Sequence, residues 1–278
     1  MREAVPGHPP AVICAPSLFL EDTAAETKSG EHLSIGTKLG YGLGEMAEGV
    51  KTATLETFLF FYYVQVIGLQ GSLVGLALLI ALLFDGISDP LIGQLSDRTN
   101  TRLGRRHPSL YLAPLPLAFA LYMLFDPPAG LGQWGTFFWL LGFTAFCRLM
   151  QSVYFIPHMA LGAELSTDFR ERISVSGYRN IFAFAGRLLV LGIAFSIFFH
   201  ATPDYPQGQL NEAAYPPLAL TCGAIALIVI LVSATTTQKR ALQYYFRMQS
   251  RGRGQVHEPM LSNLANAFRL RTFAIFFV

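Results

Sequence analysis

Charged residues are scarce in this chain, and their scarcity excludes most classes of soluble protein. Asp, Glu, Lys and Arg make up 14% of the 278 residues, whereas 52% of the residues are hydrophobic. A typical soluble domain has about 25% charged residues. The composition therefore indicates a membrane protein.

Cysteine is scarce too. Cys14, Cys147 and Cys222 lie far apart, without the spacing of a metal site and without the even number of a disulfide framework. Cys147 and Cys222 fall in apolar segments, so we expect them to be small buried residues. The chain has no His/Cys cluster and no glycine-rich loop after a strand pattern, so we expect no cofactor and no metal beyond a transported ion.

Long apolar segments are what the chain has in abundance. Each is close to, or longer than, the ~20 residues with which a helix crosses the hydrocarbon core of a bilayer. We predict spans at about 39–67, 71–96, 109–125, 135–160, 174–199 and 216–236, and a new span that begins near Thr272.

Composition divides the chain into four predicted parts. Residues 1–36 are polar and rich in Pro, which is typical of a disordered cytoplasmic tail. Residues 37–237 form a six-helix transmembrane bundle, residues 238–271 a cytoplasmic linker, and residues 272–278 the truncated start of helix seven. Because a helix of so few residues cannot span a membrane, we expect the chain to be the N-terminal half of a longer protein.

Loop charges predict the orientation. The loops after the first, third and fifth spans contain no Lys or Arg, whereas the loops after the other three are basic. By the positive-inside rule the basic loops and the N-terminus are cytoplasmic, in a multi-pass protein of the plasma (inner) membrane. We expect no nucleic-acid partner, because no aromatic stacking platform or groove-reading helix accompanies the basic loops.

Two carboxylates lie inside the second predicted span. Asp85 and Asp89 are four residues apart, so they share one face of a helix. A charged group near the bilayer centre costs about 3 kcal/mol on insertion scales and persists where it binds a cation, carries a proton or faces a polar cavity. The pair therefore predicts a site for Na⁺ or H⁺, with neutralisation by a nearby Arg as the structural alternative.

Several short motifs occur together in this chain. The sequence D-G-I-S-D-P-L-I-G at 85–93 runs into G-Q-L-S-D-R at 93–98, and G-R-R follows at 104–106. Smaller matches are Tyr41-Gly42-Leu43-Gly44-Glu45, Ile156-Pro157 and Tyr178-Arg179. The set resembles the glycoside–pentoside–hexuronide:cation symporters of the major facilitator superfamily, over about residues 37–278. The resemblance implies the six-helix N-terminal bundle of a twelve-helix fold and a substrate site shared with the C-terminal half.

The resemblance also implies a cation site. Asp85 and Asp89 match the helix-two carboxylates that bind the coupling cation in a galactoside-transporting member of the family. Ser88 and Ser152 stand where that member has Asn and Thr. Both replacements keep an oxygen, which a hard cation such as Na⁺ requires. Because two neighbouring buried carboxylates also favour a bound proton, the ion is Na⁺ or H⁺.

Substrate residues follow in the same way. Arg179 matches an Arg that contacts sugar, although it is equally suited to pair with Asp85 or Asp89. Phe155 and Met159 replace an acid and a Trp that recognise a galactosyl group, which argues against a galactoside. Glu48, Lys51 and Glu56 in the first helix are candidate replacements. Glu48 and Lys51 lie three residues apart, so they could also neutralise each other.

Two further Arg residues lie inside predicted spans. Arg148 and Arg187 match no family role, and we expect them to pair with carboxylates of the first helix.

The loop after the second span is a candidate gate. Its predicted residues are Asp97, Arg98, Gly104, Arg105 and Arg106, with Asp97 pairing with the Arg side chains when the protein faces outward. A solvated loop is the alternative.

The residues and the resemblance together predict a secondary active transporter that couples a cation to a sugar or glycoside by alternating access. A lysophospholipid symporter of the same superfamily is the alternative, because apolar Phe155 and Met159 would suit a lipid tail. A non-transporting solute sensor built on the same fold is the alternative from another class. We expect no enzyme: the aspartates faintly match a CDP-alcohol phosphotransferase pattern, but Leu82 and Thr101 stand where further acids are required.

Overall fold

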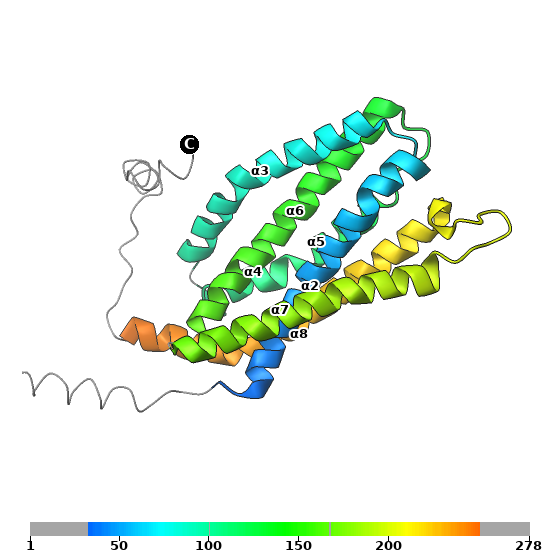
Figure 1. The fold of residues 1–278 in the computed structure, drawn as a ribbon. Helices are drawn as coiled ribbons and strands as arrows, with labels where there is room; N and C mark the ends of the chain where they lie inside the picture. The colour runs from blue at the N-terminus through cyan, green and yellow to red at the C-terminus, as the bar shows by residue number, and fades with distance from the viewer. Residues whose placement is uncertain (1–32, 100, 167, 251–278) are drawn as a thin grey trace, which may run out of the picture. The chain divides into compact units, whose positions relative to one another are not determined.

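The computed structural model describes residues 33–99, 101–166 and 168–250, and all regular secondary structure in these residues is helical (Figure 1). A helix or two consecutive helices occupy each of the six predicted spans, which confirms the predicted all-α class. The helices are α2 (Ile35–Ala53) with π-helical turns η1 (Thr54–Leu59) and η2 (Tyr62–Val66), α3 (Gly71–Arg98), α4 (His107–Leu112), α5 (Pro114–Leu124), α6 (Gln133–Glu164), α7 (Phe169–Ile193) with η3 (Ala194–Phe198), and α8 (Tyr215–Ser250) after the 3-10 turns η4 (Gly208–Leu210) and η5 (Glu212–Ala214).

Helix α2 starts earlier than predicted. It begins at Ile35, inside the range 1–36 that was predicted as a tail. The side chain of Ser34 accepts a hydrogen bond from the Thr37 amide, which satisfies one of the free amides of the first turn and so favours a helix start here. Residues 1–32 of the predicted tail lie outside the described residues.

Helix α8 ends later than predicted. It continues to Ser250, into the range 238–271 that was predicted as a linker. No Gly or Pro occurs after Gly223 within this helix, and Gln, Lys, Arg and Ala are good helix formers, so the helix continues where the sequence becomes polar. The predicted start of helix seven lies outside the described residues.

The described residues include four helical segments long and apolar enough to cross a membrane. The first predicted span is not among them because it carries several charges. The third is not among them because it is divided into α4 and α5 at Ala113. The division lies next to Pro114, which lacks an amide hydrogen. The four segments are Gly71–Arg98, Gln133–Glu164, Phe169–Phe198 and Glu212–Gln243.

Helix α3 shows why this bundle suits a bilayer. Its exposed large side chains recur every four residues, at Leu79, Leu83, Ile87, Leu91 and Leu95, with 52–68% of each surface accessible. Such a continuous apolar stripe is unusual on a soluble monomer. The stripe fits lipid chains or a second apolar bundle. Together with the four apolar segments, it shows that the chain is an integral membrane protein.

The helices associate in a defined pattern. Helix α2 packs along α7 and α8, α3 packs along α6, and α5 packs between α6 and α8 (Figure 1). Glycine allows the closest of these approaches: a Cβ on Gly49 would overlap the Ala183 carbonyl of α7, and one on Gly186 would lie 2.5 Å from the Met46 carbonyl of α2. Small residues at such crossings are the usual means of helix association in membranes.

Buried aromatic residues join the helix ends at the predicted extracellular side. The Tyr63 hydroxyl donates to the Leu124 carbonyl at 2.8 Å, and the Tyr62 hydroxyl donates to the Phe125 carbonyl at 3.1 Å. These bonds satisfy the last carbonyls of α5, which have no partner within their own helix. As expected, the thiols of Cys147 and Cys222 are free and buried.

Candidate functional site

The packing of α3 on α6 decides where Asp85 lies. The buried residues of α3 form a row that includes Ala81, Ser88 and Ile92, and Asp85 belongs to the same helical face. This face meets α6, and Arg148 Nε of α6 donates to Asp85 Oδ2 at 2.6 Å. The expected pairing of Arg148 with a carboxylate of the first helix is therefore wrong, because the partner of Arg148 comes from α3.

Asp89 is less well satisfied than Asp85. It lies one turn further along α3. The Oδ1 of each acid is buried without a hydrogen-bond partner among the described residues, but only Asp85 has an Arg at its other oxygen. Ser88 is buried between the two acids, and its hydroxyl lies 3.5 Å from the Asp85 carbonyl oxygen. Ser152 lies partly buried on α6, one turn after Arg148. The cluster thus carries two carboxylates and one guanidinium.

Two prolines add oxygen atoms to the same region. Pro90 lies inside α3 and Pro157 inside α6. Proline has no amide hydrogen, so neither residue donates the helical bond to the carbonyl four residues before it. Those carbonyls belong to Gly86 and Val153, next to the candidate cation residues Asp85 and Ser152.

Glu48 is bound by three groups, two on α2 and one on α6. Its Oε1 accepts from Lys51 Nζ at 2.9 Å and from Thr52 Oγ1 at 2.8 Å, and its Oε2 accepts from Gln151 Nε2 of α6. The mutual neutralisation of Glu48 and Lys51 that their spacing predicts is present. Thr52 and Gln151 were not predicted.

Arg179 of α7 pairs with an acid that sequence reasoning did not single out. Its Nε lies 3.4 Å from Glu45 Oε1 of α2, and its NH1 contacts the Met159 sulfur. The predicted alternative, a pair with Asp85 or Asp89, is not formed among the described residues, because α7 packs on α2 and α3 packs on α6.

A small pocket opens beside Arg179. Its volume is about 180 Å³, and its lining includes Tyr41, Met159, Gly162 and Arg179. Two of the five predicted substrate residues, Arg179 and Met159, therefore share one cavity. Phe155 instead packs against the hydrophobic core.

The predicted gating loop is a network of ion pairs. Asp97 Oδ1 accepts from Arg106 NH1 at 2.6 Å and from Arg105 NH2 at 3.3 Å. Arg106 also reaches Glu164 at 3.2 Å, which ties this loop to the end of α6. Gly104 has φ +91°, a left-handed conformation that favours glycine.

Two Arg residues of the loop differ in how many groups they contact. Arg106 also donates to Ser96 at 3.0 Å, so its guanidinium is bound on several sides. Arg98 is exposed at the last turn of α3. Neither Glu164 nor Ser96 was predicted as a partner of Arg106. The sequence offered only that Ser96 belongs to the motif at 93–98 and that Glu164 follows the predicted span 135–160 by four residues.

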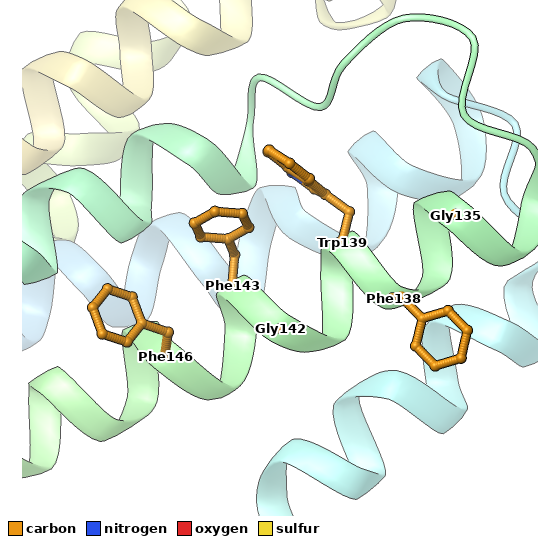
Figure 2. Close-up of a pocket in the computed structure, with 6 residues that line it drawn as sticks. All are labelled: Gly135, Phe138, Trp139, Gly142, Phe143 and Phe146. Atoms are coloured by element: carbon orange, nitrogen blue, oxygen red, sulfur yellow. The ribbon is translucent and has the colours of Figure 1, made fainter.

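A second, apolar pocket lies on the N-terminal half of α6. Figure 2 shows Trp139 and Phe143 on one side of the helix and Phe138 on the other. The pocket has a volume of about 470 Å³, and Gly135 and Gly142 also line it. Among the described residues, no charged side chain lines this pocket that could orient a sugar, whereas Arg179 lines the other pocket.

Comparison with known proteins identifies the relatives of this chain. The family described as MFS/sugar transport protein matches residues 40–278. The chain is 30% identical over 242 residues to the "Uncharacterized symporter sll1374" of Synechocystis sp., and 31% identical over 211 residues to the "Sodium-dependent lysophosphatidylcholine symporter 1-B" of Danio rerio. It is 23% identical over 207 residues to the "Isoprimeverose transporter" of Lactiplantibacillus pentosus.

The matches cover most of this chain and less of each relative. They include 85%, 74% and 73% of the chain, and 41%, 38% and 42% of the respective relatives. The chain therefore spans less than half the length of these relatives.

Proposed function

Because the chain belongs to the MFS/sugar transport protein family, we propose that it forms the N-terminal half of a cation-coupled symporter for a sugar or glycoside. The symporter names of its relatives support the class of activity, and the family description supports a sugar. The membrane would be the plasma membrane, with the N-terminus in the cytoplasm, as the loop charges predict. The second half of the substrate site would come from a C-terminal bundle.

The charge balance at α3 and α6 is the observation that carries this proposal. Arg148 forms an ion pair with one of the two carboxylates, Asp85, whereas Asp89 has no ion pair among the described residues and its Oδ1 is buried without a hydrogen-bond partner. The cluster is therefore one positive charge short of neutrality. A monovalent cation supplies that charge, and the oxygens of Ser88 and Ser152 and the carbonyl freed by Pro90 are suitable neighbours for Na⁺.

The solute site in this half is the pocket beside Arg179. A guanidinium can donate to two hydroxyls or to a carboxylate at once, which suits a sugar or a sugar acid. Met159 and Tyr41 supply the apolar and hydroxyl-bearing walls of this pocket.

A lysophospholipid is the second candidate solute, and two observations favour it. One relative is named a sodium-dependent lysophosphatidylcholine symporter, and the apolar pocket on α6 has the composition of an acyl-chain surface. A sensor without transport activity remains the proposal from another class. No enzymatic step is proposed, because the family and the relatives are named for transport.

Uptake into proteoliposomes that contain the complete transporter tests the function. Isoprimeverose and lysophosphatidylcholine are the two probes, each under an imposed Na⁺ gradient and an imposed H⁺ gradient. We expect gradient-driven accumulation of isoprimeverose, and its loss in Asp85→Asn and Asp89→Asn. Asp126→Asn is the matched control, since Asp126 is exposed in the loop after α5.

The outcomes separate the candidates. Accumulation of lysophosphatidylcholine alone would favour the lipid solute. Binding of a probe without accumulation would favour the sensor. Uptake that both substitutions leave unchanged would make the acids structural and would end the symport proposal.

A further inference from the structure

A second group of buried polar side chains surrounds His158, away from the pair Asp85 and Asp89. His158 of α6 is 0% exposed. Its ring lies between the rings of Tyr41 and Tyr154, with centroid distances of 4.3 and 5.1 Å and interplanar angles of 17° and 23°. Helices α2 and α6 therefore hold this imidazole in one orientation inside the bundle.

Several polar atoms in this group lack partners. His158 Nε2 lies 3.8 Å from Glu45 Oε2, just beyond hydrogen-bond distance. Neither atom has a hydrogen-bond partner among the described residues, and the same holds for His158 Nδ1, the Tyr154 hydroxyl and the Ser233 hydroxyl. A buried polar atom without a partner costs about 1–3 kcal/mol, so several in one place call for a ligand.

The backbone of α2 allows these atoms to converge. A Cβ on Gly44 would lie 2.5 Å from both the Ser233 Oγ and the Tyr154 hydroxyl, and 2.7 Å from His158 Cε1. A glycine at this position lets α6 and α8 bring polar side chains against the α2 backbone. Glu45, the next residue, is 5% exposed.

We propose that Glu45 and His158 bind one transported proton between them, at a site separate from Asp85 and Asp89. The proton comes from a hydronium ion of the solvent and adds to Glu45 Oε2. One O–H bond of hydronium breaks and leaves water, one O–H bond forms on the carboxyl group, no electrons are transferred, and the charge of the site rises by one. A neutral imidazole has one acceptor nitrogen. With that acceptor at Nε2, the new O–H group donates to it after a movement of less than about 1 Å.

Proton binding at this site would change what Arg179 can do. In the structure Arg179 pairs with Glu45 Oε1 and lines the pocket of about 180 Å³. A neutral Glu45 holds the guanidinium less strongly, so Arg179 becomes available to a solute in that pocket. This step rests on the proposed function and gives it a coupling route: by linkage, proton and solute raise each other's affinity by the same factor.

Titratable groups from several helices face this site. Helix α8 contributes the neutral Ser233 next to Gly44. The titratable and charged groups are Tyr41 and Glu48 on α2, His107 on α4, Tyr154 and His158 on α6, and Arg179 on α7.

Infrared difference spectroscopy between acid and alkaline pH tests proton binding directly. The complete transporter is reconstituted in lipid, and the C=O stretch of a protonated carboxyl group is recorded. We expect Glu45→Gln to remove one such band and Glu56→Gln to retain it, because Glu56 is an exposed carboxylate on the same helical segment. We expect His158→Phe to keep the ring stack and the band but to shift the frequency, since the acceptor nitrogen is lost.

Two results would overturn the proposal. One is a full set of carboxyl bands in Glu45→Gln. The other is an unchanged frequency in His158→Phe, which decides the matter even where Glu45→Gln fails to fold. A protein that takes up neither probe under either gradient would contradict the symport proposal, while the infrared bands would still decide whether this site binds a proton.

The coupling has its own measurement. We expect isoprimeverose affinity to rise by up to ~10-fold for each unit by which pH falls, the limit for one linked proton. In Glu45→Gln this dependence should vanish. A dependence that persists in Glu45→Gln would assign the linked proton to another group.

Discussion

The close crossing of α2 and α7 yields a sharp test of the packing that brings Glu45 to Arg179. A Cβ on Gly49 would overlap the Ala183 carbonyl oxygen and lie 2.9 Å from the carbonyl carbon. Both are backbone atoms of a helix and cannot rotate away. We therefore expect Gly49→Ala to force the two helices apart, at a cost of about 1–3 kcal/mol for overpacking.

Gly75→Ala is the matched control. Gly75 lies inside α3, and nothing lies within 4 Å of the position that its Cβ would take. Both substitutions gain the same helix propensity, up to about 1 kcal/mol, so this gain cancels in the comparison. The remaining difference of about 1–3 kcal/mol corresponds to roughly 2–10 °C in the midpoint of thermal unfolding.

The assay is thermal unfolding of the purified protein in one detergent, with both variants measured side by side. We expect Gly49→Ala to unfold at the lower temperature. Equal midpoints would refute the argument, because they would mean that α2 and α7 do not approach each other as closely as the structure has them.

Three further predictions concern the charged and hydroxyl groups of the bundle. Arg148→Met should lower the cation concentration for half-maximal uptake, because Asp85 then has no competing guanidinium; a higher concentration would contradict the charge balance. Lys51→Met should destabilise the fold by about 1–3 kcal/mol in thermal unfolding, since Glu48 loses its cationic partner; an unchanged midpoint would show that the pair contributes little. Tyr63→Phe should cost about 1–2 kcal/mol in the same assay, because it removes the donor to a carbonyl at the end of α5, and a value near zero would mean that water replaces the hydroxyl.

Hydropathy predicted the spans well because it reports a property of single segments. Each predicted span has its helix, and the motif residues Asp97 and Arg106 are paired. The helix ends were less accurate, since Ser34 acts through one local hydrogen bond and α8 continues through polar residues that hydropathy cannot distinguish from a loop.

Charge pairing between helices was the part that the sequence could not settle. Asp85 of α3 and Arg148 of α6 are 63 residues apart in the chain. The pairing of Arg179 with Glu45 depends in turn on Gly49 and Gly186, which allow α2 to approach α7 closely. Of the two interpretations of Arg179, the pairing with Asp85 or Asp89 is not formed among the described residues, because its partner is Glu45 of α2. The signal that could have found Glu45 was its position directly after Gly44, on a face that only a closely packed neighbour can cover.

The buried thiols have a practical consequence for studying conformational change. Because Cys147 and Cys222 are 0% and 1% exposed, polar maleimide reagents should not reach them. The described part of the chain would then give no labelling signal of its own. Single cysteines introduced along α3 or α7 could report, by their rates of modification, which side of the membrane the bundle faces as ion and solute are added.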